Sequence, residues 1–303
     1  MAHGLRHDAK TFAAAVAATL VITQGCSTGS EPATSAASTS AAVQATSSDP
    51  VQADFRRLLA EVARRQRVDV RWTGGPYSYK YDWGGGSAAD PSEEDVARVA
   101  APIARELLLY PDGFLRNAGL HAIVLVRDLF VAEDGGARGA AAYIFEDRLF
   151  LDVPLADRAI RAGTRVRFIH HIIWHRLDEL AGTMWKDPEW VALNPPKFEY
   201  GVYSRGGVHE ARAGAGSLST EYPGFLNLYS TGNLPDDKAE VCAYLMVIHS
   251  WVRERSREDL YLQRKVAVIK ARLAALDPAF DDVFWNRIDA DADDPVRYGA
   301  RQR

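Results

Sequence analysis

The stretch Phe168-Ile-His-His-Ile-Ile-Trp-His-Arg-Leu-Asp-Glu-Leu180 decides how the rest of the chain is interpreted. His171 and His175 are four residues apart. On a helix this spacing places both imidazoles on one face, one turn apart. Two histidines so placed can bind one Zn²⁺ ion with bonds of about 2.0–2.1 Å. The stretch therefore predicts a helix that offers two ligands to a metal ion.

The residue after the first of these histidines bears on what such a site can do. In the His-Glu-x-x-His arrangement of zinc-dependent peptidases, the Glu is the general base that takes a proton from water. In this chain that position is Ile172, whose side chain has no titratable atom. General acid–base groups contribute about 10²–10⁴-fold to a rate, so the sequence predicts weak or no peptidase activity.

A third ligand is expected from a later segment, because a zinc site needs at least three protein ligands and one helix face supplies two. Asp236 and Glu240 are four residues apart in a predicted helix and share a face. One could bind the metal while the other holds a histidine through a hydrogen bond, and the sequence leaves their roles open. Asp236 and Asp237 could equally be acids that cap the free N–H groups at the start of that helix.

Other polar residues near the histidines have simpler expected roles. Asp178 and Glu179 follow His175 and are better placed to orient a histidine than to take a proton at the metal. On a helix His170 points about 100° away from His171, so we expect it to pack or to form hydrogen bonds away from the metal. A base from elsewhere in the chain is conceivable. The candidates in the loop that follows are Tyr203, His209 and Glu210.

Four motifs between residues 164 and 246 carry a resemblance to a known family. They are His-His-x-x-x-His-Arg-Leu-Asp, Leu-Asn-Pro, Tyr-Pro-Gly-Phe, and a Tyr that precedes an Asp-x-x-Ala-Glu helix. This pattern resembles a group of zinc-binding metallopeptidases, many of which are bacterial lipoproteins. Its second half is similar to the zinc site of the anthrax lethal factor type. The resemblance implies an α+β, zincin-like fold, in which a small sheet packs on the histidine helix and further helices follow.

Residue by residue, the resemblance implies a site. His171 and His175 match the two histidine ligands, and Asp236 matches the third, acidic ligand, which is normally Glu. Asp is an ordinary zinc ligand with a shorter reach. Tyr229 matches a tyrosine that hydrogen-bonds the reacting carbonyl oxygen, and Glu240 matches a structural acid on the same helix.

Because Ile172 stands where the family has its catalytic Glu, three functions remain open. The chain could be an inactive relative that still binds Zn²⁺ and a peptide or cell-wall fragment. It could be a working zinc-dependent hydrolase that takes its base from elsewhere. It could also be a metal-free structural lipoprotein that acts through partners.

The N-terminus has the features of a targeting segment. Arg6 and Lys10 precede an apolar run over residues 12–22, which is of signal-peptide length and too short to span a bilayer. A small residue lies directly before Cys26, as at a bacterial lipoprotein processing site, although Thr23 stands where Leu is common. We expect lipidation of Cys26 and anchoring to a membrane. A plain secretory signal is the alternative.

The segment after Cys26 supports a tether. Residues 27–50 are almost wholly Ser, Thr, Ala, Gly, Pro and Gln, so we expect a disordered linker before one domain at residues 51–303. Ser27, by resemblance to lipoproteins of two-membrane bacteria, favours the outer membrane or its periplasmic face. Cys242 has no expected partner and should be a small buried residue. The net charge of −4, with no basic block, argues against nucleic acid as a partner.

Hydrophobic periodicity and turn residues give the expected elements. The expected helices are residues 51–66, 91–110, 157–180 with a break at Gly163, 240–255, 260–276 and 280–288. The expected strands are residues 68–72, 121–127, 140–145 and 149–153. Residues 73–87 and 185–216 should be loops, and residues 289–303 a frayed polar tail. Within the second loop we expect a small apolar core of Trp185, Trp190 and Tyr200.

Overall fold

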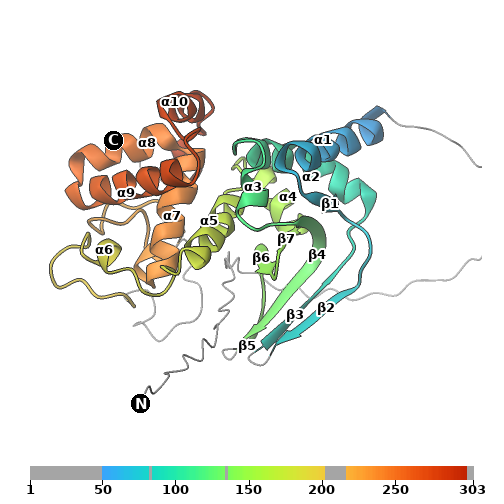
Figure 1. The fold of residues 1–303 in the computed structure, drawn as a ribbon, viewed down its shortest axis with the longest axis horizontal. Helices are drawn as coiled ribbons and strands as arrows, with labels where there is room; N and C mark the ends of the chain where they lie inside the picture. The colour runs from blue at the N-terminus through green and yellow to red at the C-terminus, as the bar shows by residue number, and fades with distance from the viewer. Residues whose placement is uncertain (1–49, 82–83, 134–135, 202–215, 299–303) are drawn as a thin grey trace, which may run out of the picture.

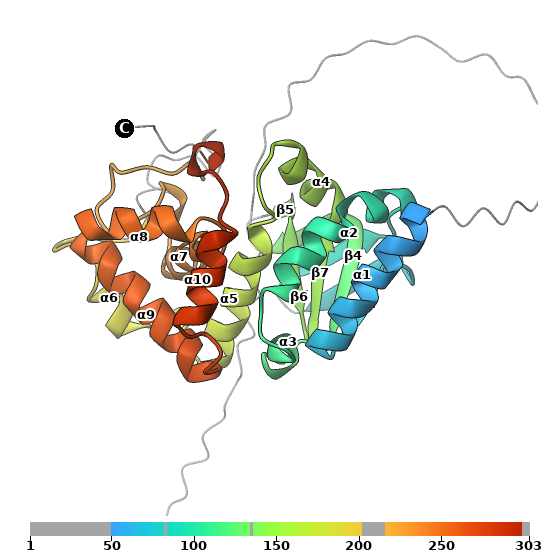
Figure 2. The same ribbon diagram turned by 90° about the horizontal axis from the view of Figure 1, so that it is seen from above.

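The computed structural model describes residues 50–81, 84–133, 136–201 and 216–298. The expected signal peptide, Cys26 and nearly all of the expected linker lie outside these ranges. Helix α5 (Phe168–Leu180) lies between two groups of elements, a sheet with its helices on one side and a helical group on the other (Figures 1 and 2). No helix among the described residues is long and apolar enough to cross a membrane.

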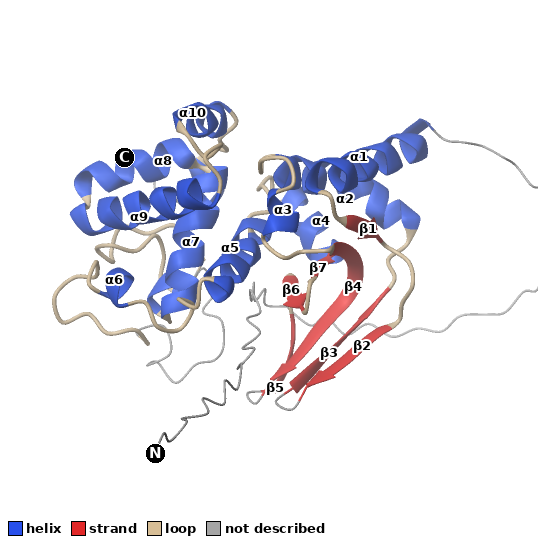
Figure 3. Cartoon of the chain, in the orientation of Figure 1, coloured by secondary structure: helices blue, strands red, loops and turns tan. Residues whose placement is uncertain are grey.

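The first group is built on a mixed seven-stranded sheet in which β4 is central (Figure 3). The strands are β1 (Asp69–Arg71), β2 (Tyr77–Tyr81), β3 (Gly84–Ala89), β4 (Ala122–Glu133), β5 (Gly136–Gly139), β6 (Ala142–Phe145) and β7 (Arg148–Asp152). Strands β1 and β7 run parallel to β4, while β3 and β5 pair with it antiparallel. Strand β6 pairs antiparallel with β7 and ends the sheet beside α5.

Four helices accompany this sheet, namely α1 (Pro50–Gln66), α2 (Glu93–Leu108), α3 (Phe114–Asn117) and α4 (Val153–Arg161). Helix α1 buries Phe55, Leu59 and Val62 in the main core, as its helical periodicity predicts. Ser92 caps the N-terminus of α2, where its hydroxyl accepts the N–H of Asp95. These helices bury one face of the sheet, and α2 also contacts α5.

The second group contains α6 (Pro188–Val191), η1 (Tyr229–Thr231), α7 (Leu234–Val247), α8 (His249–Glu258), α9 (Leu260–Leu276), α10 (Asp282–Ala290) and η2 (Pro295–Tyr298). All 14 residues of α7 are buried, because α5, α8 and α9 pack around it. In α5, ten of 13 residues are buried, with α2 and β6 as neighbours on one side and α7 on the other. Helix α5 is therefore a wall that both groups share.

Most expected helices are confirmed, including the break near Gly163 that separates α4 from α5 and the bounds of α9. The expected loop at residues 73–87 is wrong, because it holds the hairpin of β2 and β3. Its glycines serve packing: a Cβ at Gly86 would come within 2.3 Å of the Tyr79 ring. Strand β5 was not expected either, since Gly136–Gly139 has little strand character.

Two expectations in the C-terminal half are also wrong. The expected helix at residues 240–255 is two helices, because Ile248 leaves helical geometry between α7 and α8. The tail is not frayed up to Tyr298, whose buried side chain hydrogen-bonds Asp293 Oδ2 at 2.9 Å. The expectation that Cys242 is a small buried residue is confirmed, since its side chain is buried.

Candidate metal centre

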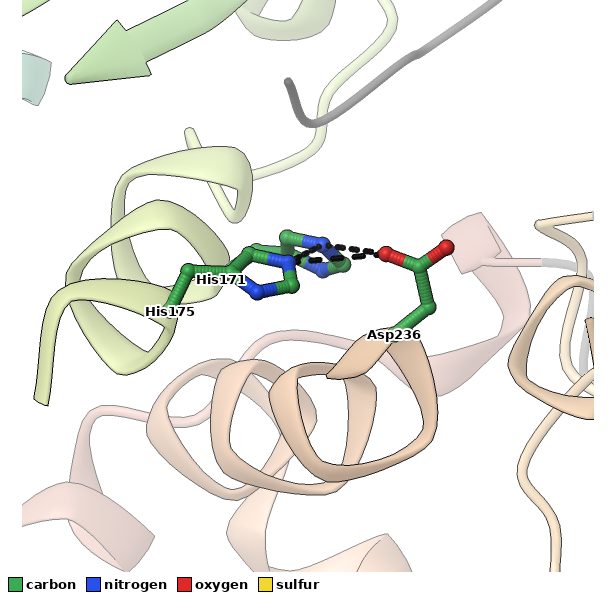
Figure 4. Close-up of side chains that lie close together, drawn as sticks. All are labelled: His171, His175 and Asp236. Atoms are coloured by element: carbon green, nitrogen blue, oxygen red, sulfur yellow. Dashed lines mark hydrogen bonds and ion pairs between the residues drawn. The ribbon is translucent and has the colours of Figure 1, made fainter. Parts of the chain in front are cut away.

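Three potential metal ligands converge between α5 and the first turn of α7 (Figure 4). His171 Nε2 lies 2.9 Å from His175 Nε2. Asp236 Oδ1 lies 3.3 Å from the first of these nitrogens and 3.5 Å from the second. All three residues are buried, with exposed fractions of 2%, 2% and 6% for His171, His175 and Asp236. The structure thus brings the two histidines together with Asp236 and leaves Glu240 outside this group.

The spacing of these atoms fits a tetrahedral zinc site. With bonds of about 2.0–2.1 Å, neighbouring ligand atoms in such a site lie about 3.3 Å apart. The three separations of 2.9, 3.3 and 3.5 Å bracket that value. Burial alone would raise the pKa of Asp236, but hydrogen bonds from both histidines outweigh it and hold the pKa well below its usual range. The set is therefore two imidazole nitrogens and one ionised carboxylate, which suits zinc.

Asn233 both starts α7 and aims the carboxylate of Asp236. Its side-chain oxygen accepts the Asp236 N–H at 2.8 Å, which caps the helix. Its side-chain nitrogen donates to Asp236 Oδ2 at 2.7 Å. Because Oδ2 is held in this way, Oδ1 is the oxygen turned toward the histidines. Capping by Asp236 and Asp237, the simpler expectation, is not what these side chains do.

Glu240 fixes the orientation of His171, as the sequence allowed. His171 Nδ1 lies 2.9 Å from Glu240 Oε1, and since an ionised carboxylate only accepts, Nδ1 carries the hydrogen. Glu240 also pairs with Arg167 and accepts from Asn227 Nδ2 at 2.5 Å. Burial would raise the pKa of Glu240, but the Arg167 charge and these hydrogen bonds lower it to about 2. His171 Nε2 is consequently the ring nitrogen that faces the other two ligands.

The two histidines differ in their proton affinity. Burial lowers the pKa of His171, but its hydrogen bonds to Asp236 and Glu240 outweigh burial and raise it overall. For His175 burial dominates, and the pKa is lowered despite the Asp236 carboxylate. His175 Nδ1 has no hydrogen-bond partner among the described residues, whereas a histidine ligand usually donates its second N–H to one.

Tyr229 lies beside this group, as the family resemblance implied. Its ring centroid is 6.1 Å from that of His171, and its hydroxyl hydrogen-bonds Asp236. Burial, together with the nearby carboxylates of Asp236 and Glu240, raises the pKa of Tyr229 well above its usual value. The hydroxyl therefore stays protonated and remains a hydrogen-bond donor.

Asp178 and Glu179, the acids expected to orient a histidine, have other hydrogen-bond partners. Asp178 pairs with Lys238 of α7 and accepts the Thr183 hydroxyl at 2.6 Å. Glu179 pairs with Arg176 at 2.9 Å. Asp178 thus links α5 to α7, and Glu179 forms an ion pair within α5. Among the described contacts, Glu240 is the acid that orients a ligand histidine.

Ile172, which follows the first of the two histidines, lies in apolar surroundings. Ile172 is 1% exposed and belongs to the main hydrophobic core. The neighbouring acid on α7, Asp237, accepts from Lys265 at 2.7 Å, which leaves it ion-paired rather than free to move a proton. The alternative bases Tyr203, His209 and Glu210 lie outside the described residues.

The expected apolar core of the following loop is partly wrong. Trp190 is fully buried, but its indole N–H donates to Asp237 Oδ2 at 2.8 Å, and the Tyr200 hydroxyl donates to the same atom at 2.7 Å. Trp185 is 56% exposed and lies outside this core. The aromatic rings therefore surround the buried ion pair of Asp237 and Lys265.

The sequence analysis missed three residues of the site. Arg167, Asn227 and Asn233 each bind Glu240 or Asp236 through a side-chain hydrogen bond. Arg167 also lies over the Tyr244 ring at 4.4 Å. Long-range pairing of a polar residue leaves no periodic pattern, although Asn233 could have been found as a helix cap three residues before Asp236.

Comparison with known proteins adds little to this geometry. No protein-family model matches the chain, and no curated protein matches it at a significant level. Among solved structures, it is similar to a "putative zinc-binding metallo-peptidase" from Bacteroides caccae ATCC 43185, with 15% sequence identity and a TM-score of 0.42. The match covers 80% of this chain and 93% of that one. A likeness at this level carries no argument about function, so the metal centre rests on its own contacts.

Proposed function

We propose that this chain is a zinc-binding, peptidase-related α+β domain of zincin-like fold that has lost its general base. The observation that carries the proposal is the convergence of His171 Nε2, His175 Nε2 and Asp236 Oδ1 from two packed helices. We further propose, from the sequence alone, that a lipid on Cys26 holds the domain at the cell envelope, at the outer membrane or its periplasmic face.

The three converging residues would hold the ion, and zinc bound there supplies a Lewis acid. Glu240, neutralised by Arg167, keeps His171 in the tautomer whose Nε2 is free to bind. The protonated hydroxyl of Tyr229 is a donor beside the site, and such a donor stabilises a developing oxyanion. Ligand positioning and oxyanion stabilisation are therefore both available from this chain.

What the described part of the chain lacks is a free carboxylate at the site. Each nearby acid that is not itself a ligand has a cationic partner. These pairs are Glu240 with Arg167, Asp237 with Lys265, Asp178 with Lys238, and Glu179 with Arg176. Losing general-base catalysis costs about 10²–10⁴-fold in rate. The site is thus better suited to binding a peptide or cell-wall fragment than to cleaving it.

Metal content tests the first half of the proposal. Purified protein should hold about one equivalent of zinc, and His171→Ala/His175→Ala should hold none. His170→Ala is the matched control, since it removes a neighbouring buried histidine that has no contact with the ligand group. Absence of metal from the wild type, even after zinc is supplied, would reject the metal centre and favour a metal-free, partner-binding lipoprotein.

Peptide hydrolysis tests the second half. Ile172→Glu should raise cleavage of an unbiased peptide library by about 100-fold or more. Ile173→Glu is the control, because Ile172 and Ile173 are both 1% exposed and both variants bury a carboxylate. Only Ile172→Glu places the carboxylate where the His-Glu-x-x-His arrangement has its general base. A wild type that cleaves as fast as Ile172→Glu would reject the impaired enzyme and point to a base from elsewhere.

A further inference from the structure

A second group of titratable side chains lies in the helical half, apart from the metal centre. His249 begins α8, Lys270 lies in α9, and Asp289 lies in α10. Lys270 Nζ is 2.7 Å from His249 Nε2, and His249 Nδ1 is 3.0 Å from Asp289 Oδ1. The Trp285 ring stacks on the imidazole, with centroids 5.4 Å apart. The three polar groups therefore form a chain from a carboxylate through an imidazole to an amine.

The carboxylate fixes which imidazole nitrogen faces the amine as an acceptor. Asp289 is also paired with the Arg253 guanidinium at 2.8 Å, and a carboxylate in such an ion pair only accepts hydrogen bonds. His249 Nδ1 must then carry the hydrogen that it shares with Asp289. The lone pair of Nε2 is left for Lys270 Nζ, and it can take a proton from that amine.

Lys270 differs in this respect from the two fully buried lysines that the structure describes. Lys238 pairs with Asp178 and Asp187, and Lys265 pairs with Asp237. A carboxylate stabilises the ammonium form, while a neutral imidazole leaves the amine free to lose its proton. The described lysines that are solvent-exposed are Lys80, Lys186 and Lys197. Lys270, by contrast, is half-buried.

The charges around Lys270 act in both directions. Burial and the Arg253 guanidinium lower the pKa of Lys270, and the carboxylates of Asp282 and Asp289 oppose them. The Trp285 ring, 4.6 Å from Nζ, also favours the ammonium. The balance lowers the pKa of the amine, and burial likewise lowers that of His249. Two neighbouring bases thus share one proton in a site that disfavours a second.

We propose that Lys270 is a reactive amine and a modification site for carbonyl electrophiles such as activated acyl esters. Once the shared proton has left for water, the unprotonated Nζ attacks the ester carbonyl and forms a C–N bond, while His249 Nε2 still has its lone pair. The C–O bond then breaks, and its electron pair leaves with the alcohol part of the ester. The proton released from Nζ passes to His249 Nε2, where the Asp289 carboxylate stabilises the imidazolium, and then to water.

Competitive acetylation tests this site in the whole protein. A limiting amount of the N-hydroxysuccinimide ester of acetic acid is added at pH 7, and peptide mass spectrometry measures the extent at each lysine. A lowered pKa exposes more free amine at pH 7, so Lys270 should react faster than exposed Lys186 by more than the error of the measurement. Its pH–rate profile should also reach half-maximum at a lower pH than that of Lys186.

His249→Gln, checked for folding by circular dichroism, should bring the rate at Lys270 down to that of Lys186 or below. Acetylation of Lys270 no faster than Lys186 in the wild type would overturn the proposal, as would a coincident pH profile for the two lysines. If His249→Gln folds and keeps the fast rate, the imidazole is not the proton acceptor and the assigned step is wrong.

Discussion

Two adjacent histidines on α5 have opposite kinds of surroundings. His170 Nε2 lies 2.8 Å from Glu106 Oε2, and its Nδ1 lies 2.8 Å from the Tyr110 hydroxyl. Each of its nitrogens has one partner, the first as donor and the second as acceptor. His171 has a partner of this kind only at Nδ1, where it meets Glu240. Its Nε2 faces a second imidazole nitrogen and a carboxylate oxygen.

The difference separates a structural histidine from a candidate ligand. Around His170 the network is closed, because Arg165 also donates two hydrogen bonds to Glu106, one of them at 2.8 Å. At His171 the Nε2 atom meets an imidazole nitrogen and a carboxylate oxygen, three atoms that can share a proton or hold a cation between them. Burial is the same for both residues, so it is the partners of the ring nitrogens that distinguish them.

The largest effect is expected where the closed network is broken. Glu106→Ala leaves the buried Arg165 guanidinium without its carboxylate and should destabilise the fold by about 3–5 kcal/mol in urea unfolding. Zinc stoichiometry should not change. Glu93→Ala, which removes an exposed pair with Arg56, is the control and should cost less than about 1 kcal/mol. A loss equally small in Glu106→Ala would mean that this network does not hold α2 to α5.

Acid should unfold the protein partly through the same carboxylate. Burial would raise the pKa of Glu106, but hydrogen bonds from His170 and Arg165 lower it from 4.5 to about 2. A carboxylate whose folded pKa is lowered stabilises the fold above its unfolded pKa, and this stability is lost as pH falls from about 4.5 toward 2. Its contribution is about 3 kcal/mol.

Unfolding free energies measured between pH 6 and pH 2 check this expectation. Glu106→Gln keeps the shape of the side chain but cannot titrate, so its stability should fall less steeply over that range than that of the wild type. Parallel curves for the two proteins would show that Glu106 does not carry the acid sensitivity.

At the candidate metal ligands, the largest loss of zinc affinity should come from removing the acid that orients His171. Glu240→Gln should weaken zinc affinity by about 10–100-fold, because outer partners of metal ligands contribute that much. Asp237→Asn is the matched control, since it lies beside Asp236 but bonds Lys265 rather than a histidine. Competition with a fluorescent chelator measures both affinities. Equal losses in the two variants would mean that Glu240 acts through stability alone.

The smallest effect compares two helix caps. Asn233→Ala and Ser92→Ala each remove an N-cap and should each cost about 1 kcal/mol of stability. Only Asn233 also holds Asp236 Oδ2, at 2.7 Å. Zinc affinity should therefore fall, by about tenfold at most, in Asn233→Ala and stay unchanged in Ser92→Ala. An unchanged affinity in both would leave Asn233 with a capping role only.

Elements with regular hydrophobic periodicity could be predicted from the sequence, and those shaped by distant packing could not. Helix α9 has one buried stripe and was predicted at its observed bounds. Helix α7 is buried on every side, so its apolar pattern gives no sign of the break at Ile248. The strand at Gly84–Ala89 was missed because its glycines make room for the Tyr79 ring, which no local rule reveals.

The candidate site shows the same division. The spacing of His171 and His175, together with the acids of the later helix, was enough to predict a convergence of ligands at α5. Which acid faces the histidines depends on Asn233, which holds one oxygen of Asp236, and on Arg167, which holds Glu240 away from the group. These are contacts between segments far apart in the sequence or at a helix end, and spacing along one helix does not encode them.

The first turns of α7 have a consequence for how this chain can vary. Four successive polar residues of this segment form ion pairs or hydrogen bonds with other elements. The pairs are Asp236 with the α5 histidines, Asp237 with Lys265 of α9, Lys238 with Asp178, and Glu240 with Arg167. Inserting or deleting one residue there would rotate every later side chain by about 100° around the helix axis, which would break all of these pairs at the same time. A substitution at Ile172 on α5 changes one buried side chain and leaves these pairs in register, whereas the length of this segment of α7 is fixed by four partners at once. Lineages of this protein should therefore differ here by replacement and not by insertion.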